Sequence, residues 1–202
     1  MDTFSILTVC SGNICRSPLA EQLLRTGLST FAGVEVTSAG TMALVGQGMT
    51  QQAQALSLRF GGVEPQRHAA RELTIALIRD ADLVFAMSRE HRRAVVELLP
   101  RASRTTFMIR EFARLVVNVP EPEFAEIAQL PRGDLSARFT AAVELAASRR
   151  GIVQHPDAPD DDNVVDPYGQ SDAVYQRSAE QIVPAVRAVL TFFDRAASVA
   201  LR

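Results

Sequence analysis

The sequence contains no lysine, so all 21 of its basic residues are arginines. Lysine is the residue that forms Schiff bases with carbonyl substrates, and it also contacts the phosphates in a P-loop nucleotidase. Both chemistries are therefore excluded. Arginine remains available to bind a phosphate group, because its planar fork donates two parallel hydrogen bonds to an oxyanion.

Cysteine and histidine are scarce as well, with two and three residues respectively. Two cysteines cannot build a disulfide framework, and Cys10 and Cys15 do not belong to the paired C-x-x-C arrays of zinc sites. His68, His91 and His155 are scattered, which is more typical of surface or supporting residues than of metal ligands. We expect no metal and no cofactor.

The chain also lacks a strong net charge and long apolar runs. Its formal charge of −2 gives no global field that would attract nucleic acid. No uninterrupted apolar run is long enough to cross a bilayer, and the first four residues lack the basic region of a signal peptide. We expect a cytoplasmic protein without membrane insertion and without a nucleic-acid partner.

The order of the predicted elements indicates an α/β fold. With 202 residues, 47% of them hydrophobic, the chain is expected to form one domain over residues 1–202. Apolar, β-branched runs alternate with segments of helical spacing, which favours a parallel sheet of about four strands with helices on both faces. The strands are predicted at 4–9, 34–36, 82–87 and 105–109, and the helices from Ser17-Pro18 onward and at 51–60, 89–99 and 172–200.

Residues 117–163 interrupt this alternation and are interpreted as an insertion. The segment holds Pro120, Pro122 and Pro131, one helix-patterned stretch over 135–146 and an acidic cluster at 157–162. Three possibilities stay open: the segment covers the active site, it binds a partner, or it does neither. The acidic cluster is interpreted as a solvated, mobile loop in preference to a cation site.

A thiol and a guanidinium stand at the two ends of a seven-residue loop, residues 10–16, between the first strand and the first helix. Such a loop points successive backbone N–H groups inward at a helix N-terminus, where they can hold phosphoryl oxygens, and Arg16 adds its fork. The same environment holds Cys10 as a thiolate, which is the nucleophilic form. Ser17 is expected to donate to that sulfur and to cap the helix, Glu21 to favour the positive end of the helix, and Asn13 to suit a left-handed turn beside Gly12.

Residues 166–169, Asp-Pro-Tyr-Gly, offer the acid that phosphoryl transfer from an aryl group requires. Pro167 stiffens a turn that can hold the Asp166 carboxylate over the loop, and Tyr168 can flank a flat substrate ring. Taken alone this is an ordinary turn, and only the loop upstream gives it a catalytic interpretation.

Residues 9–18 together with 166–169 resemble the low-molecular-weight protein tyrosine phosphatase family. The likeness extends to residues 38–41, 68–71 and 82–91, which leaves out mainly the insertion. The resemblance implies that Cys10 is the nucleophile, that Arg16 binds the phosphate, and that Asp166 is the general acid and then the base. It also implies a phosphate-binding loop made by Ser11, Gly12, Asn13, Ile14, Cys15 and Ser17, supported by Ser38 and His68.

Two positions bear on the substrate. Leu44 stands where many members of the family have tryptophan, which resembles the bacterial subgroup whose partners are autophosphorylating tyrosine kinases of capsule or exopolysaccharide export. Leu44 is then one apolar wall and Tyr168 the other, although Leu44 can equally be part of the core. Ile14 resembles the phosphotyrosine enzymes, whereas related phosphoarginine phosphatases have threonine there.

Two rival functions and one open role remain. A thiol-dependent arsenate reductase resembles this fold and loop but relays a disulfide through further cysteines, and only Cys15 is available besides Cys10. A non-catalytic phosphate-binding module is the other rival. Cys15 is either a small apolar residue under the loop or a thiol that forms a disulfide with oxidised Cys10.

Overall fold

The computed structural model describes residues 3–158 and 160–200, and its centre is a parallel sheet of four strands. The order of the strands in the sheet is β2-β1-β3-β4. All three strand pairings are parallel, as predicted, and Cys10 at the end of β1 lies opposite Gly40 at the end of β2. The strands are β1 (Phe4–Cys10), β2 (Val34–Gly40), β3 (Leu83–Ala86) and β4 (Thr106–Met108).

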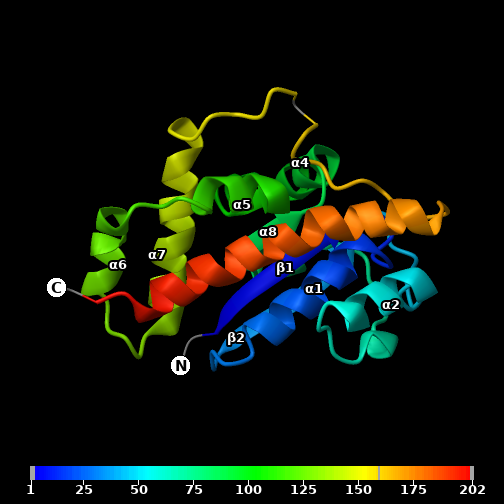
Figure 1. Ribbon diagram of the computed structural model, residues 1–202, viewed down its shortest axis with the longest axis horizontal. Helices are drawn as coiled ribbons and strands as arrows, with labels where there is room; N and C mark the ends of the chain where they lie inside the picture. The colour runs from blue at the N-terminus through cyan, green and yellow to red at the C-terminus, as the bar shows by residue number, and fades with distance from the viewer. Residues whose placement is uncertain (1–2, 159, 201–202) are drawn as a thin grey trace.

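Helices cover both faces of this sheet, because β1 alternates between two hydrophobic clusters. Phe4 and Ile6 belong to the larger cluster, and Leu7 and Val9 belong to the smaller one. The larger cluster is completed by α1, α2, α5, α6, α7 and α8, and the smaller one by α3 and α4. In Figure 1, α8 runs across the molecule in front of β1, beside α1 and α5.

The eight α-helices of the described residues include every helix that the sequence predicts. They are α1 (Arg16–Gly27), α2 (Gln51–Arg59), α3 (Ile75–Arg79), α4 (Arg89–Leu98), α5 (Ile109–Val116), α6 (Ala125–Gln129), α7 (Leu135–Ser148) and α8 (Asp172–Ser198). Short 3-10 turns lie at η1 (Pro65–Arg67), η2 (Pro100–Arg104), η3 (Glu121–Phe124) and η4 (Arg149–Gly151). None of the described helices is long and apolar enough to cross a membrane.

The segment 117–163 contributes to the main hydrophobic core. Phe139 of α7 is fully buried, and its ring lies 5.4 Å from that of Phe4, at the amino end of β1. Cys10 lies at the opposite end of the same strand. Of the roles left open for this segment, covering the active site is therefore not performed by α7, which packs at the far end of the sheet (Figure 1).

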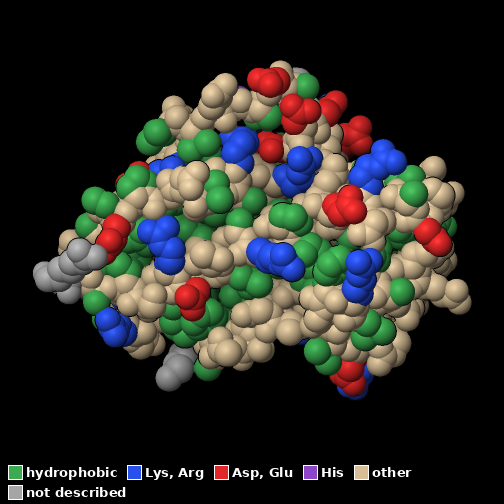
Figure 2. Space-filling model, in the orientation of Figure 1, with side chains coloured by type: hydrophobic (Ala, Val, Ile, Leu, Met, Phe, Trp, Pro, Cys, Tyr) green, Lys and Arg blue, Asp and Glu red, His purple; other side chains and the backbone are tan. Residues whose placement is uncertain are grey.

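The acidic cluster that follows α7 is only partly solvated. Figure 2 shows acidic side chains gathered at the rim where residues 152–163 run, and Asp157, Asp160 and Asp161 are exposed. Asp162 is buried, however, and pairs with Arg114 of α5 at 2.7 Å. The prediction of a wholly solvated loop was therefore wrong at Asp162, because an arginine 48 residues away in sequence fixes that carboxylate.

Candidate active site

The loop of residues 10–16 lies at the carboxyl end of β1, where the chain turns to β2 on one side and β3 on the other. In open α/β sheets, ligands bind outside the carboxyl ends of the strands at this reversal. Helix α1 begins directly after the loop at Arg16. The topology therefore brings the end of a strand and the amino end of a helix together around the seven residues.

The predicted cap of α1 was wrong. The cap position belongs to Cys15, no side chain caps the helix, and Ser17 is its second residue. The Ser17 hydroxyl accepts from Asn13 instead, and it lies 2.9 Å from the Cys10 sulfur, to which the sequence analysis expects it to donate. The prediction for Glu21 was wrong as well, because this residue lies beyond the first turn and its buried carboxylate accepts hydrogen bonds from Ser38 Oγ and Arg25.

Asn13 fixes the shape of the loop. It has φ 55°, the left-handed conformation that the sequence predicts, and its side chain is fully buried. Asn13 Nδ2 donates to Ser17 Oγ at 3.0 Å and to Ser38 Oγ at 2.8 Å. Its Oδ1 accepts from the backbone N–H of Arg71 at 3.0 Å, and its carbonyl oxygen lies 2.6 Å from His68 Nε2. Because a carbonyl only accepts, His68 carries its proton on Nε2.

The sulfur of Cys10 has a hydroxyl partner whose direction follows from this network. Cys10 Sγ lies 2.9 Å from Ser17 Oγ, and both side chains are buried. Since Ser17 Oγ already accepts from Asn13 Nδ2, the Ser17 proton is free to donate to the sulfur. A donated hydrogen bond stabilises a thiolate, so the geometry supports Cys10 in its nucleophilic form.

Arg16 converges on the same place from the first position of α1. Its side chain is buried, with Nη1 donating to the Val164 carbonyl at 3.3 Å and Nη2 to Ser11 Oγ at 3.3 Å and Asp166 Oδ2 at 2.5 Å. Its Nε is buried and has no hydrogen-bond partner among the described residues. A buried donor without a partner is costly, and an oxyanion at the loop would satisfy it.

Asp166 stands at the mouth of the site on the loop before α8. Its side chain is 51% exposed, and its Oδ1 accepts from the backbone N–H of Tyr168 at 3.2 Å, which holds the turn that the sequence predicts. Its Oδ2 faces Arg16. Although they are 150 residues apart in sequence, the two side chains form an ion pair.

A cavity of about 160 Å³ joins these groups. Leu44 and Tyr168, the two predicted walls, both line the cavity, and Leu44 also packs against the core. Met42, which the sequence analysis missed, is a further wall residue. The complete lining is Cys10, Ser11, Gly12, Ile14, Cys15, Arg16, Met42, Leu44, Asp166 and Tyr168.

His91 is a second residue that the sequence analysis missed. Its Nε2 lies 2.9 Å from Ser11 Oγ and its Nδ1 lies 2.8 Å from Ser88 Oγ, which links α4 to the loop. Burial, and then the positive charge of Arg16, lowers the pKa of His91 to about 3. One signal was available: the strand ending at Ala86 runs parallel to β1, so residues shortly after it lie beside the loop.

The sulfur of Cys15 lies beside two hydroxyl groups. Its sulfur lies 3.5 Å from Thr50 Oγ1 and 3.6 Å from the Tyr175 hydroxyl. Burial raises the pKa of Cys15, so it is a thiol at neutral pH. Among the described residues, no group of three or more His, Cys, Asp or Glu side chains is placed to hold a metal ion.

Gly40 is required where β2 ends beside the loop. A Cβ atom built at this position would lie 2.3 Å from the carbonyl oxygen of Ser11, far inside van der Waals contact. Because that neighbour is backbone, a side chain at position 40 would displace the loop itself.

Comparison with known proteins agrees with this geometry. Residues 5–145 match the family model described as low molecular weight phosphotyrosine protein phosphatase. Low molecular weight protein-tyrosine-phosphatase Etp of Escherichia coli K12 is 38% identical over 118 residues, which cover 58% of this chain and 76% of Etp. Ptp of Acinetobacter johnsonii is 33% identical over 118 residues, covering 58% and 79%.

Solved structures show the same fold over nearly the whole chain. The tyrosine phosphatase AmsI of Erwinia amylovora superposes with a TM-score of 0.63 at 23% identity, covering 94% of this chain and 92% of AmsI. The arginine phosphatase YwlE of Geobacillus stearothermophilus has a TM-score of 0.63 at 24% identity, covering 93% and 91%. The parallel sheet and the loop after its first strand define an α/β enzyme of the phosphatase class. The chain belongs to the low molecular weight protein-tyrosine phosphatase family.

Proposed function

We propose that the protein hydrolyses phosphotyrosine in proteins through a phosphocysteine formed on Cys10. The observation that carries this proposal is the convergence of Cys10, Arg16 and Asp166 on one cavity of about 160 Å³. The family supports the enzyme class, and the geometry supports the roles of the individual residues. A non-catalytic module would not need a thiol, a phosphate-binding cation and an acid around the same cavity.

In the first step, the thiolate of Cys10 attacks phosphorus and forms the S–P bond while the bond from phosphorus to the tyrosine oxygen breaks. Asp166 gives its proton to the departing phenolate, so the leaving group departs as neutral tyrosine. The phosphoryl oxygens receive hydrogen bonds from the loop N–H groups and from Arg16, whose buried Nε has no partner among the described residues.

The bond between Arg16 and Asp166 couples substrate binding to this proton transfer. Arg16 Nη2 is 2.5 Å from Asp166 Oδ2, and a phosphate held by the arginine fork would compete for the same nitrogen. Substrate binding then releases the Asp166 carboxylate from the ion pair, so that it can take a proton from solvent and carry it to the leaving group. The exposure of Asp166 at the mouth of the cavity leaves room for this movement.

In the second step, Asp166 acts as the base. It accepts a proton from water, the oxygen of that water attacks phosphorus, and the S–P bond breaks with release of phosphate and of the Cys10 thiolate. The Ser17 hydroxyl, 2.9 Å from the sulfur, stabilises the departing thiolate. No redox change occurs, so this reaction needs no third thiol.

Ile14 favours phosphotyrosine as the substrate. Its side chain lines the cavity, in the position where the resemblance places threonine in phosphoarginine enzymes. Together with Leu44, Met42 and Tyr168 it gives the cavity an apolar wall that suits an aromatic ring. We also propose cytoplasmic location and, from the resemblance at Leu44, an autophosphorylating tyrosine kinase of polysaccharide export as partner.

The test is turnover of p-nitrophenyl phosphate, a phosphotyrosine peptide and a phosphoarginine peptide by the wild type and by Cys10→Ser. We expect release of phosphate from the two aryl substrates by the wild type only, with Cys10→Ser still binding vanadate because the loop N–H groups and Arg16 remain.

Arg16→Lys should bind vanadate weakly, since the point charge of lysine does not replace the two parallel hydrogen bonds of a guanidinium. Substantial turnover by Cys10→Ser would exclude the mechanism, and preference for phosphoarginine would exclude the substrate.

A further inference from the structure

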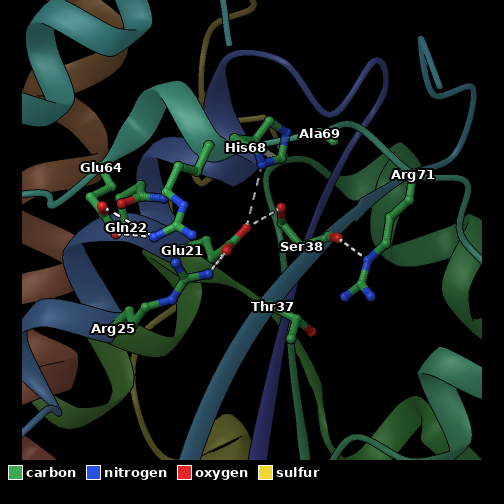
Figure 3. A pocket seen from close by; sticks show the side chains of 10 residues that line it. Glu21, Gln22, Arg25, Thr37, Ser38, Glu64, His68, Ala69 and Arg71 are labelled. Atoms are coloured by element: carbon green, nitrogen blue, oxygen red, sulfur yellow. Dashed lines mark hydrogen bonds and ion pairs between the residues drawn. The ribbon is translucent and has the colours of Figure 1, made fainter. Parts of the chain in front are cut away.

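A second cavity, of about 490 Å³, lies behind the phosphate-binding loop. It opens between α1, β2 and residues 64–71, and none of its lining residues lines the cavity at Cys10. Figure 3 shows Glu21 and Arg25 reaching into it from α1, Ser38 from β2, and His68 and Arg71 from the facing segment. Its volume lies within the range of about 300–1,000 Å³ that is typical of small-molecule sites.

The charges around this cavity leave one cation without a carboxylate. Three arginines and two glutamates line it. Arg25 pairs with Glu21, and Arg67 pairs with Glu64 at 3.0 Å. Arg71 takes part in none of the ion pairs formed by the described residues.

Arg71 is held with its fork free for an oxyanion. Its Nε donates to the Ser38 carbonyl at 2.8 Å, and in Figure 3 its two terminal nitrogens carry no dashed line. The side chain is partly buried, and burial lowers its pKa. A cation that is partly removed from water and unpaired is costly, so an anion beside it would be stabilised. Two terminal N–H groups in one plane match a carboxylate or phosphate.

The other groups on the wall are polar as well. Besides Arg71, the lining includes the side chains of Thr37, Ser38 and His68. The chemistry therefore fits a small, polar anion.

Three residues on the wall of this cavity hold Asn13, the left-handed residue of the phosphate-binding loop. Ser38 Oγ accepts from Asn13 Nδ2 at 2.8 Å, and His68 Nε2 donates to the Asn13 carbonyl at 2.6 Å. The backbone N–H of Arg71 donates to Asn13 Oδ1 at 3.0 Å. A molecule bound to Arg71 therefore acts directly on the groups that fix the loop.

We propose that this cavity is a second binding site, for a small molecule with a carboxylate or phosphate group, and that its occupation changes catalysis through Asn13. Anion binding draws the Arg71 guanidinium toward the ligand and alters its bond to the Ser38 carbonyl. Ser38 and Arg71 both hold Asn13, so the loop responds without any contact between ligand and substrate. The effect on catalysis rests on the proposed function, whereas the binding does not.

The binding test follows the arginine Nε–H signals of the full-length chain by NMR. Inorganic phosphate and malonate are titrated in separate arms at constant ionic strength, and Arg71 is assigned by the signal that Arg71→Gln removes. We expect the Arg71 signal of the wild type to saturate in at least one arm. Saturation by phosphate alone, with vanadate already occupying the Cys10 loop, identifies a phosphoryl ligand, and saturation by malonate alone identifies a carboxylate ligand. A drift that is linear in both arms and equal to that produced by sodium chloride would overturn the proposal.

Variants then locate the site and the coupling. Arg71→Gln should weaken binding by about tenfold or more, measured on the remaining shifted signals, whereas the exposed control Arg79→Gln should not. If Arg71→Gln does not fold, the wild-type titration still decides whether an anion binds at Arg71. The saturating anion should change kcat for p-nitrophenyl phosphate by about twofold or more in the wild type and in Arg79→Gln. A change confined to KM would show competition at Cys10 and overturn the coupling.

Discussion

At the scale of single residues, Asp166 is defined by its exposure and by its ion pair with Arg16. If it protonates the leaving group, Asp166→Asn should lower kcat for phenyl phosphate by about 100-fold or more, and far less for dinitrophenyl phosphate, whose leaving group needs no proton. A leaving-group series measures this difference. Asp172→Asn, at the start of α8, is the control. Parallel losses across the series would reduce Asp166 to a turn residue.

His91 gives a pH dependence to folding rather than to catalysis. Because its pKa falls from 6.5 to about 3 in the folded state, the unfolded chain binds a proton between these values that the folded chain does not. Stability is therefore lost as the pH falls below 6.5. Between neutral pH and about pH 4, His91→Gln should remove on the order of a few kcal/mol of this loss in the free energy of unfolding. Urea titrations at each pH measure it. An equal slope in His91→Gln and in the exposed control His155→Gln would contradict this assignment.

We predict that Cys15 protects Cys10 from irreversible oxidation. Peroxide converts the Cys10 thiolate to a sulfenic acid, and the Cys15 thiol can then displace water and form a disulfide that dithiothreitol reduces. We expect the wild type to recover activity after peroxide and dithiothreitol, and Cys15→Ala to recover much less. Equal recovery would mean that Cys15 only packs against Thr50 and Tyr175, its neighbours in the fold.

At the scale of helices, Arg138 joins the ends of α6 and α8 from within α7. It is fully buried, and its guanidinium donates to the carbonyls of Leu130 at 2.7 Å, Ala196 at 2.8 Å and Val199 at 2.5 Å. Arg138→Met keeps the apolar stem and leaves three carbonyls without this donor. The free energy of unfolding should fall by about 3 kcal/mol or more, measured in urea.

The control for that change is Arg132→Met, an exposed arginine just before the same helix. It should leave the free energy of unfolding within about 0.5 kcal/mol of the wild type. Similar losses in both variants would mean that the hydrogen bonds to the ends of α6 and α8 do not carry the effect.

Elements with a local stop signal could be predicted from the sequence, and those without one could not. Gly61 after α2 and Pro100 after α4 end helices where the pattern predicts. In contrast, α5 follows β4 without a break at Ile109, and its start is fixed by Glu111 accepting from the Met108 N–H. The sequence has no glycine or proline there to mark the end of the strand and the start of the helix, so the hydrophobic periodicity did not reveal this helix.

The same distinction holds for the site. The loop of residues 10–16 could be predicted because its chemistry is contiguous, whereas the contact of His91 with Ser11 joins residues 80 positions apart. Ser17 was misassigned for a related reason. A serine before an apolar run predicts a cap, but this hydroxyl accepts from Asn13, which only the folded loop brings to it. Its contact with the Cys10 sulfur, in contrast, was expected from the sequence.

At the scale of the whole molecule, we propose that residues 117–163 fold with the rest of the chain as one unit. The packing of Phe139 against Phe4 and Phe193 places α7 in the main core. Thermal unfolding should therefore show one transition, with equal calorimetric and van't Hoff enthalpies. A chain that lacks residues 117–163 should not fold cooperatively, because it exposes that core. Two separate transitions in the full chain would show that this segment is an independent unit.

The positions of the two tyrosines make the intrinsic fluorescence of the protein a probe of its active site. It has no tryptophan and only two tyrosines, and both lie at the active site. Tyr168 lines the cavity and is 56% exposed, and Tyr175 is buried with its hydroxyl 3.6 Å from Cys15. All tyrosine emission from the molecule therefore originates within contact distance of the catalytic loop. Ligand occupancy and thiol oxidation can be followed in the ultraviolet without a label or an introduced fluorophore.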